Sequence, residues 1–258
     1  MFSCLVQIII FIFGMCLGSF VNVCIYRLPA SKSIIDPLRS ICPNCGSIIR
    51  FYDNIPVLSY LLLKRRCRHC NKPISYRYPL VEIMSGVFAL CTFLKFGPTL
   101  EALVYFAFIT ALLVITFIDI NHKIIPDIIT IPGIPAGFLA SFALPSITYK
   151  ESLLGLLAGG GTLLLVGWIY YLIKKAEGMG GGDIKLMAMI GIIVGWEGIL
   201  FTIFFSSLIG TLVGITIMLR TKKGMKVAVP FGPFLSIGAI TYIFFGPGLT
   251  SWYFNLLR

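Results

Sequence analysis

The sequence predicts an all-α, polytopic membrane protein with about eight transmembrane helices and one small polar insertion. Hydrophobic residues make up 58% of the 258-residue chain and charged residues only 12%. The mean hydropathy of +0.96 lies far outside the balance of a soluble globular domain. A helix needs about 20 residues to cross a hydrocarbon layer of about 30 Å. Apolar runs near that length lie at residues 4–25, 80–96, 100–118, 126–144, 152–173, 197–219 and 231–246, with a shorter run at 184–195.

The first run, residues 1–26, is expected to be a retained transmembrane span. It has no basic segment in front of the apolar residues and no clean small-residue cleavage site, both of which a removable signal peptide would need.

The runs at 184–195 and 197–219 are expected to be two spans. One continuous helix over both would be about 54 Å long at 1.5 Å per residue, which is too long for one crossing. Gly195 and Gly198 flank a natural turn between the two runs. This division gives eight crossings.

The basic residues are distributed very unevenly over these crossings. The chain has 21 Lys and Arg against 10 Asp and Glu, a net charge of +11. With eight crossings, 18 of the 21 basic residues fall on one side, and the positive-inside rule makes that side cytoplasmic and both termini external. The positive-inside distribution in a lipid bilayer accounts for the net charge without an acidic binding partner. No nucleic-acid partner is therefore expected.

Residues 27–78 form a basic, polar cytoplasmic insertion that contains two CxxC knuckles. Such a pair is typical of a tetrahedral zinc site with four thiolates, which leaves no open position for catalysis and is therefore structural. Two disulfides are the alternative, but a cytoplasmic loop is reducing, and so short a segment needs a metal to fold. The expected zinc ligands are Cys42, Cys45, Cys67 and Cys70.

Two carboxylates stand out at the cytoplasmic ends of spans. Asp119 lies at the end of one predicted helix, where the helix dipole disfavours an anion, so a capping role does not explain it. Asp183 follows Gly180, Gly181 and Gly182 and opens another helix. A charged group at the edge of a membrane span is a functional-site hypothesis. Two aspartates that share a proton can activate water for peptide hydrolysis.

The residues around this pair have competing interpretations. The glycines let a peptide backbone approach Asp183, and Lys185 is a candidate supporting residue. Asp127 follows Pro126 at a predicted helix start, which favours capping over catalysis. Glu82 either pairs with Arg77 or faces a polar cavity.

Other hydrolytic chemistries are poorly supported. The sequence has neither a GxSxG nor an HExxH motif, so a serine hydrolase and a zinc metalloprotease are disfavoured. The two histidines, His69 and His122, are not next to an obvious nucleophile in the sequence. We expect His69 to be a solvated residue of its knuckle and His122 to be interfacial.

Several motifs together resemble the bacterial prepilin peptidases, also called type IV leader peptidases. They cover the chain from about residue 14 to residue 240 in order. Besides the paired knuckles, they are Gly18-Ser19-Phe20-Val21-Asn22-Val23-Cys24-Ile25-Tyr26-Arg27-Leu28-Pro29, Asn54-Ile55-Pro56-Val57-Leu58-Ser59-Tyr60, Arg77-Tyr78-Pro79-Leu80-Val81-Glu82, Ile125-Pro126-Asp127, Gly180-Gly181-Gly182-Asp183 and Phe231-Gly232-Pro233-Phe234.

This resemblance implies an inner-membrane aspartic endopeptidase that removes the leader of type IV prepilins and type II secretion pseudopilins on the cytoplasmic side. Asp119 and Asp183 match the catalytic positions. The resemblance also implies N-methylation of the new N-terminus with S-adenosylmethionine, associated with residues 27–78, and makes residues 79–258 the peptidase core. The alternatives are a protease that cuts within spans, a proton-coupled transporter, and a non-enzymatic assembly scaffold.

Overall fold

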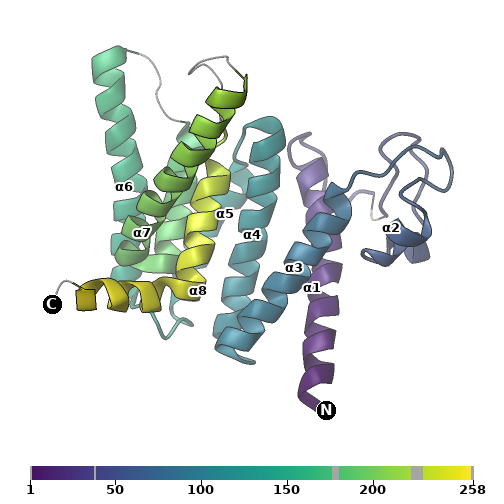
Figure 1. The fold of residues 1–258 in the computed structure, drawn as a ribbon, viewed down its shortest axis with the longest axis horizontal. Coiled ribbons are helices and arrows are strands. Elements are labelled where there is room, and N and C mark those ends of the chain that lie inside the picture. The colour runs from purple at the N-terminus through teal and green to yellow at the C-terminus, as the bar shows by residue number, and fades with distance from the viewer. Residues whose placement is uncertain (1, 38, 176–179, 222–228, 257–258) are drawn as a thin grey trace. The chain divides into compact units, whose positions relative to one another are not determined.

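The computed structural model describes residues 2–37, 39–175, 180–221 and 229–256. Within these ranges the ordered elements are helices, and strand pairing is limited to two isolated bridges. The all-α prediction is confirmed (Figure 1). The helices are α1 (Phe2–Arg27), α2 (Leu58–Leu62), α3 (Arg77–Phe96), α4 (Leu100–His122), α5 (Asp127–Ser141), α6 (Tyr149–Lys174), α7 (Gly181–Thr221) and α8 (Gly232–Leu256), with the 3-10 helix η1 (Phe51–Asn54) in the insertion.

Five helices of the described chain, α1, α3, α4, α6 and α7, are long and apolar enough to cross a membrane. Two shorter apolar stretches, Asp127–Ser141 and Gly232–Gly246, lie between or after them. The protein is therefore a multi-pass membrane protein, and the count of eight crossings stays a prediction.

The chain forms two compact units, Met1–Val114 and Ile115–Arg258. The first unit contains α1, the whole insertion, α3 and the first part of α4, whereas the second contains the end of α4 and α5 to α8. The insertion thus shares a compact unit with the helices on either side of it.

In the first unit, α1 and α3 pack with their backbones in close contact. A Cβ atom on Gly18 would lie only 2.7 Å from the Cα atom of Glu82. Further along α3 the glycine is on α3 and the backbone that it approaches is on α1: a Cβ on Gly86 would lie 3.0 Å from the backbone oxygen of Phe11. Small residues at such crossings are the usual means of close helix packing in membranes, and here they fix Glu82 next to α1.

The start of the insertion is organised by the buried guanidinium of Arg27, the last residue of α1. This side chain is 5% exposed and donates to four backbone carbonyl oxygens. The acceptors are Ser33 (3.1 Å), Ile34 (2.9 Å), Pro37 (2.9 Å) and Arg39 (3.3 Å).

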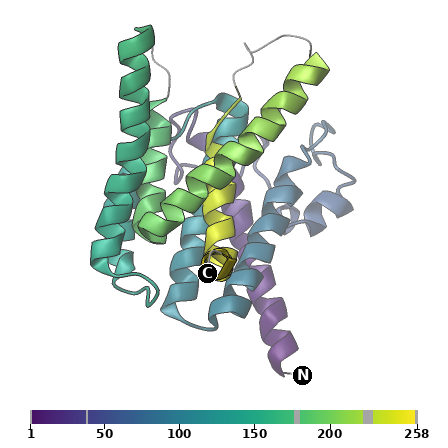
Figure 2. The same cartoon turned by 60° about the vertical axis from the view of Figure 1, so that its left-hand side comes forward.

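In the second unit, α7 is broken at Gly195, which has φ 72° and ψ 179°. A positive φ of this kind is readily adopted only by glycine. Figure 2 shows the two parts of α7 running in different directions on either side of this break. The predicted break between the two apolar runs is confirmed at Gly195.

The first part of α7 is the centre of the second unit. Its side chains at Leu186, Met187 and Ile190 are fully buried, because α5, α6 and α8 all pack against α7. The contact with α6 is closest at two glycines, where a Cβ on Gly155 would lie 2.1 Å from the backbone oxygen of Gly191. These two glycines thus let the backbones of α6 and α7 approach closely.

Candidate active site and metal centre

Asp119 lies in the last turn of α4 and is 5% exposed. Its Oδ2 atom accepts a hydrogen bond of 2.9 Å from the backbone N–H of Gly232, the first residue of α8. The carboxylate at the C-terminus of one helix thus lies at the N-terminus of another, where the dipole favours an anion. Gly232 belongs to the Phe-Gly-Pro-Phe motif, and nothing in the sequence around it indicates this contact with Asp119.

Asp183 lies in the first turn of α7 and is half-buried. It is close enough to Asp119 for the two carboxylate charges to interact. Ile125 lies between the first residues of α7 and α8: a Cβ on Gly182 would be 2.9 Å from the Cβ of Ile125, and a Cβ on Gly232, which binds Asp119, would be 3.4 Å from its Cδ1. The structure therefore brings both candidate aspartates into one site.

The three glycines before Asp183 differ in what surrounds them. Gly182 is closed off by Ile125, whereas a Cβ on Gly181 would meet no atom within 4 Å. A Cβ on Gly180 would lie 3.3 Å from Oδ2 of Asp183 itself. Gly181 thus faces open space, and a side chain at Gly180 would crowd the Asp183 carboxylate. Glu177 to Met179, just before them, lie outside the described residues.

Lys185 pairs with Asp127 rather than with either candidate aspartate. Its Nζ atom lies 2.8 Å from both carboxylate oxygens of Asp127, and both side chains are half exposed. Asp127 makes no capping hydrogen bond, because Pro126 occupies the N-cap position of α5 and has no side-chain acceptor. What remains of the capping interpretation is that the negative charge of Asp127 lies in the first turn of α5, where the helix dipole stabilises it.

The four predicted zinc ligands lie together in the insertion. All four sulfur atoms lie within 4.8 Å of one another, and those of Cys42 and Cys70 are 3.9 Å apart. Tetrahedral ligands at the usual Zn–S distance of about 2.3 Å are about 3.8 Å from each other, so the cluster can hold a zinc ion. All cysteines of the described chain are free thiols, and the disulfide alternative is not observed.

The two knuckles have the same backbone geometry. In each, the residue after the second cysteine has a positive φ, 70° at Gly46 and 56° at Asn71, and these residue types adopt that conformation most readily. Each knuckle is closed by two hydrogen bonds, Cys42 N–H to Ser47 O and Gly46 N–H to Cys42 O in the first, and Cys67 N–H to Lys72 O and Asn71 N–H to Cys67 O in the second.

The thiols of the cluster are tuned by their neighbours. Hydrogen bonding to Ser47 lowers the pKa of Cys45 to about 6, and the backbone N–H of Cys70 lowers the pKa of Cys67. The backbone amide of Lys72 favours the thiolate of Cys70, but burial and hydrogen bonds to the other thiols raise the pKa of Cys70 to about 11. A bound cation would supply the charge that deprotonates the last thiol.

Glu82 faces a cavity and does not pair with Arg77. It is 7% exposed, and its Oε2 atom accepts a 2.8 Å hydrogen bond from the backbone N–H of Val57. His69 lines the same cavity at its exposed rim, and His122 is exposed in the last turn of α4.

Two regions of the chain match known protein families. Residues 12–96 match the bacterial peptidase A24 N-terminal domain, and residues 106–215 match the type IV leader peptidase family. The first match covers α1, the insertion and α3, and the second covers both candidate aspartates.

Curated relatives match along nearly the whole chain. A protein of Myxococcus xanthus is 36% identical over 97% of this chain and 76% of its own length. A protein of Aeromonas hydrophila is 32% identical over 95% of this chain and 92% of its own length, and one of Burkholderia pseudomallei is 34% identical over 91% and 84%. All three carry the name prepilin leader peptidase/N-methyltransferase. No solved structure matches the chain.

Proposed function

Because the chain belongs to the type IV leader peptidase family, we propose that it is a membrane aspartic endopeptidase with N-methyltransferase activity. It removes the leader of type IV prepilins and type II secretion pseudopilins at the cytoplasmic face of the inner membrane. It then methylates the new N-terminus with S-adenosylmethionine. The observation that supports the peptidase is that two carboxylates, from α4 and α7, lie close enough for their charges to interact.

The proposed catalytic pair is Asp119 and Asp183. One carboxylate accepts a proton from a water molecule while the other, protonated, donates a hydrogen bond to the scissile carbonyl. The water oxygen attacks the carbonyl carbon, and the tetrahedral intermediate collapses as the peptide nitrogen takes a proton from the pair. The Gly232 N–H holds Asp119 in place, and the small residues Gly180 and Gly181 leave room for the extended substrate.

The topology suits a substrate that has a polar leader followed by an apolar helix. The junction of such a chain lies at the membrane surface, and both aspartates lie at helix ends. With eight crossings, the positive-inside rule places these ends in the cytoplasm and both termini outside.

The four cysteines are the proposed ligands of a structural zinc ion. They meet the geometric and chemical requirements of such a site. An ion held by four thiolates would fix the fold of the insertion without taking part in hydrolysis. The methyl-transfer activity is assigned to the first unit, which contains the N-terminal family domain.

The test is leader removal from a purified prepilin by the parent protein and by Asp119→Asn and Asp183→Asn in liposomes, with mass spectrometry of the product. Each substitution is expected to reduce cleavage at least about 100-fold, as loss of general acid–base catalysis does. Glu197→Gln, an exposed carboxylate elsewhere on α7, is the matched control and should cleave like the parent.

A mass increment of about 14 Da on the mature N-terminus would establish methylation. If both aspartate variants remain folded and cleave normally, the aspartic-peptidase proposal is wrong, and a transport or scaffold function has to be considered instead.

A further inference from the structure

A cavity of about 420 Å³ lies within the first unit. It is lined by the insertion, the start of α3 and one face of α1. The α1 residues recur with the three-to-four-residue spacing of a helix face. They are Ser19, Asn22, Val23, Tyr26 and Arg27.

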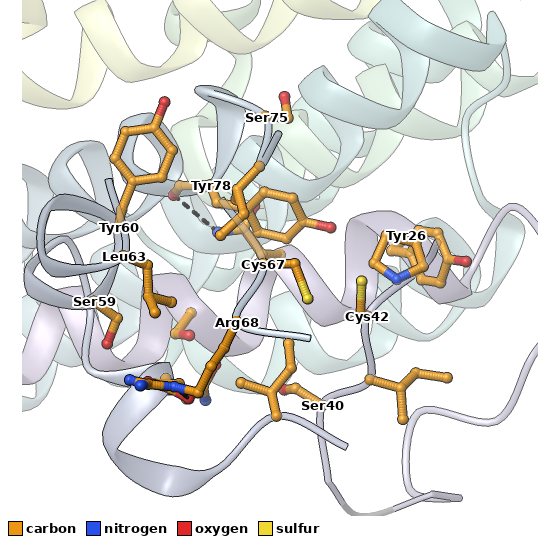
Figure 3. Close-up of a pocket in the computed structure, with 18 of the residues that line it drawn as sticks. Tyr26, Ser40, Cys42, Ser59, Tyr60, Leu63, Cys67, Arg68, Ser75 and Tyr78 are labelled. Atoms are coloured by element: carbon orange, nitrogen blue, oxygen red, sulfur yellow. Dashed lines mark hydrogen bonds and ion pairs between the residues drawn. The ribbon is translucent and has the colours of Figure 1, made fainter. Parts of the chain in front are cut away.

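The walls of the cavity are largely aromatic and aliphatic. Figure 3 shows the rings of Tyr26, Tyr60 and Tyr78 around the cavity, together with the sulfur atoms of Cys42 and Cys67. Small-molecule and cofactor sites typically have volumes of about 300–1,000 Å³, apolar walls and a few placed polar groups. The cavity has the size and lining of such a site.

Two buried hydrogen-bond acceptors face this cavity. The Asn22 side chain is 2% exposed, and its Nδ2 atom donates to the backbone oxygen of Tyr78 at 3.0 Å. Its Oδ1 atom has no partner in the described chain. Glu82 is the second acceptor: its carboxylate accepts the Val57 N–H and a hydrogen bond from the Ser19 side chain, and a carboxylate has capacity for about four such bonds. A buried acceptor that lacks a donor, as Asn22 Oδ1 does, indicates that a bound ligand or water supplies one.

No cationic side chain of the described residues pairs with Glu82. Two of the cations that line the cavity are engaged elsewhere: Arg27 binds backbone carbonyls of the insertion, and Arg68 forms a two-point ion pair with Asp53 at 2.7 and 2.8 Å. Lys72, which also lines the cavity, is exposed. The guanidinium of Arg77 lies 5.6 Å from the ring centroid of Tyr78. A buried carboxylate without a counter-ion is costly, and the cost is removed when a cationic ligand binds.

The backbone is strained where it holds Glu82. Val57 has φ 61° and ψ −47°, which is rare for a β-branched residue, and Leu58 N–H donates across it to Pro56 O. This tight turn directs the Val57 N–H at the Glu82 carboxylate. Such conformations cost about 1–3 kcal/mol and gather at functional sites. The strained turn holds the Val57 N–H in the position from which it orients the Glu82 carboxylate.

We propose that this cavity binds the methyl donor, an adenosyl sulfonium cation, and that Glu82 is its counter-charge. The proposal rests on the methyltransferase activity proposed above. A planar base suits the tyrosine rings, and the donor's positive charge suits Glu82 and the Asn22 acceptor. In the reaction the amine nitrogen forms a bond to the methyl carbon as the carbon–sulfur bond breaks. Sulfur keeps the electron pair as a neutral thioether, and the proton of the amine goes to solvent.

One consequence distinguishes this site from a general apolar pocket. The donor loses its sulfonium charge during the transfer, so a counter-charge at Glu82 binds the donor more tightly than the spent thioether. The spent thioether would then leave the site more readily than the donor.

The experiment is equilibrium binding of S-adenosylmethionine and S-adenosylhomocysteine to the full-length protein in detergent. Glu82→Gln removes the charge but keeps an oxygen that can accept the Val57 N–H, so the turn is retained. Loss of a charge-assisted contact should weaken S-adenosylmethionine binding about 10- to 100-fold and S-adenosylhomocysteine binding less. Val23→Trp, which fills the cavity, should abolish binding of both. Glu101→Gln, on α4 and outside the cavity lining, should bind both like the parent.

Parent-like binding by both Glu82→Gln and Val23→Trp would overturn the proposal. So would a Glu82→Gln protein that binds the donor normally but no longer methylates, since Glu82 would then act on the peptide amine. The parent's own activity separates this inference from the proposed function: if the parent cleaves but never adds a methyl group, the methyltransferase proposal fails first. If the parent methylates and the two variants bind like it, only the cavity assignment fails.

Discussion

Replacing Gly232 by alanine should slow leader removal while leaving the fold intact. The added Cβ would lie 2.7 Å from Oδ2 of Asp119, about 0.7 Å closer than the 3.4 Å at which ordinary contact begins. The carboxylate is at the end of a side chain and can move, so we expect the carboxylate to shift while the helix backbone stays in place. Its movement lengthens the hydrogen bond from the Gly232 N–H, which is 2.9 Å in the parent.

The size of the effect follows from that hydrogen bond. A bond to a charged group contributes about 1.5–3 kcal/mol, and a displacement of this kind in a catalytic group lowers rates by up to about 100-fold. We therefore expect leader removal to be about 10- to 100-fold slower, with the midpoint of thermal unfolding changed by less than about 3 °C.

The control is Gly161→Ala on α6, because a Cβ at that glycine would meet no atom within 4 Å. Cleavage would be measured on the same prepilin in liposomes for the parent and both variants. A Gly232→Ala protein that cleaves at the parent rate would show that the position of Asp119 does not depend on α8, and the reasoning above would be wrong.

Three further predictions concern the metal centre, the ion pair and the helix packing. Replacing Cys42 and Cys67 together by serine should remove bound zinc, measured by elemental analysis, and lower thermal stability and methylation of a pre-cleaved substrate more than peptide cleavage; equal loss of both reactions in a folded protein contradicts this. Lys185→Gln should change the cleavage rate by less than about fivefold, because its exposed ion pair with Asp127 contributes only about 0–1 kcal/mol. A larger loss of rate in a steady-state assay would show that Lys185 supports the aspartate pair. Gly155→Ala should destabilise the protein by at least about 1–3 kcal/mol, because the new Cβ meets the Gly191 backbone at 2.1 Å; an unchanged unfolding midpoint would refute the packing argument.

The features that the sequence predicts well are those decided by nearby residues. Except for α8, which continues to Leu256 beyond the predicted end at residue 246, the apolar runs end within a few residues of the helix ends, because span length is set by bilayer thickness. The break at Gly195 follows from length alone, since no single crossing could hold both runs. The four-cysteine cluster was predictable because each knuckle supplies two thiols within four residues, and only one pairing of knuckles exists.

The features that the sequence does not give depend on contacts between distant segments. Gly232 reaches Asp119 from 113 positions away, and a glycine beside a proline indicates a turn before anything else. Glu82 did not pair with Arg77, because residues five apart on a helix lie on different faces; its partner, the Val57 N–H, is 25 positions away. Asp127 was interpreted as a cap because Lys185, which approaches from α7, is remote in the sequence.

The two proposed sites hold their carboxylates in the same way but must act in a fixed order. Asp119 and Glu82 are both buried acidic side chains that accept one backbone N–H, from Gly232 and Val57. Before cleavage the future N-terminal nitrogen is an amide, whose lone pair is delocalised and does not attack a sulfonium carbon. Methylation therefore has to wait for hydrolysis, and loss of either Asp119 or Asp183 should abolish both reactions on an intact prepilin. Loss of Glu82 should leave cleavage intact and yield an unmethylated product, so the dependence between the two sites runs in one direction only.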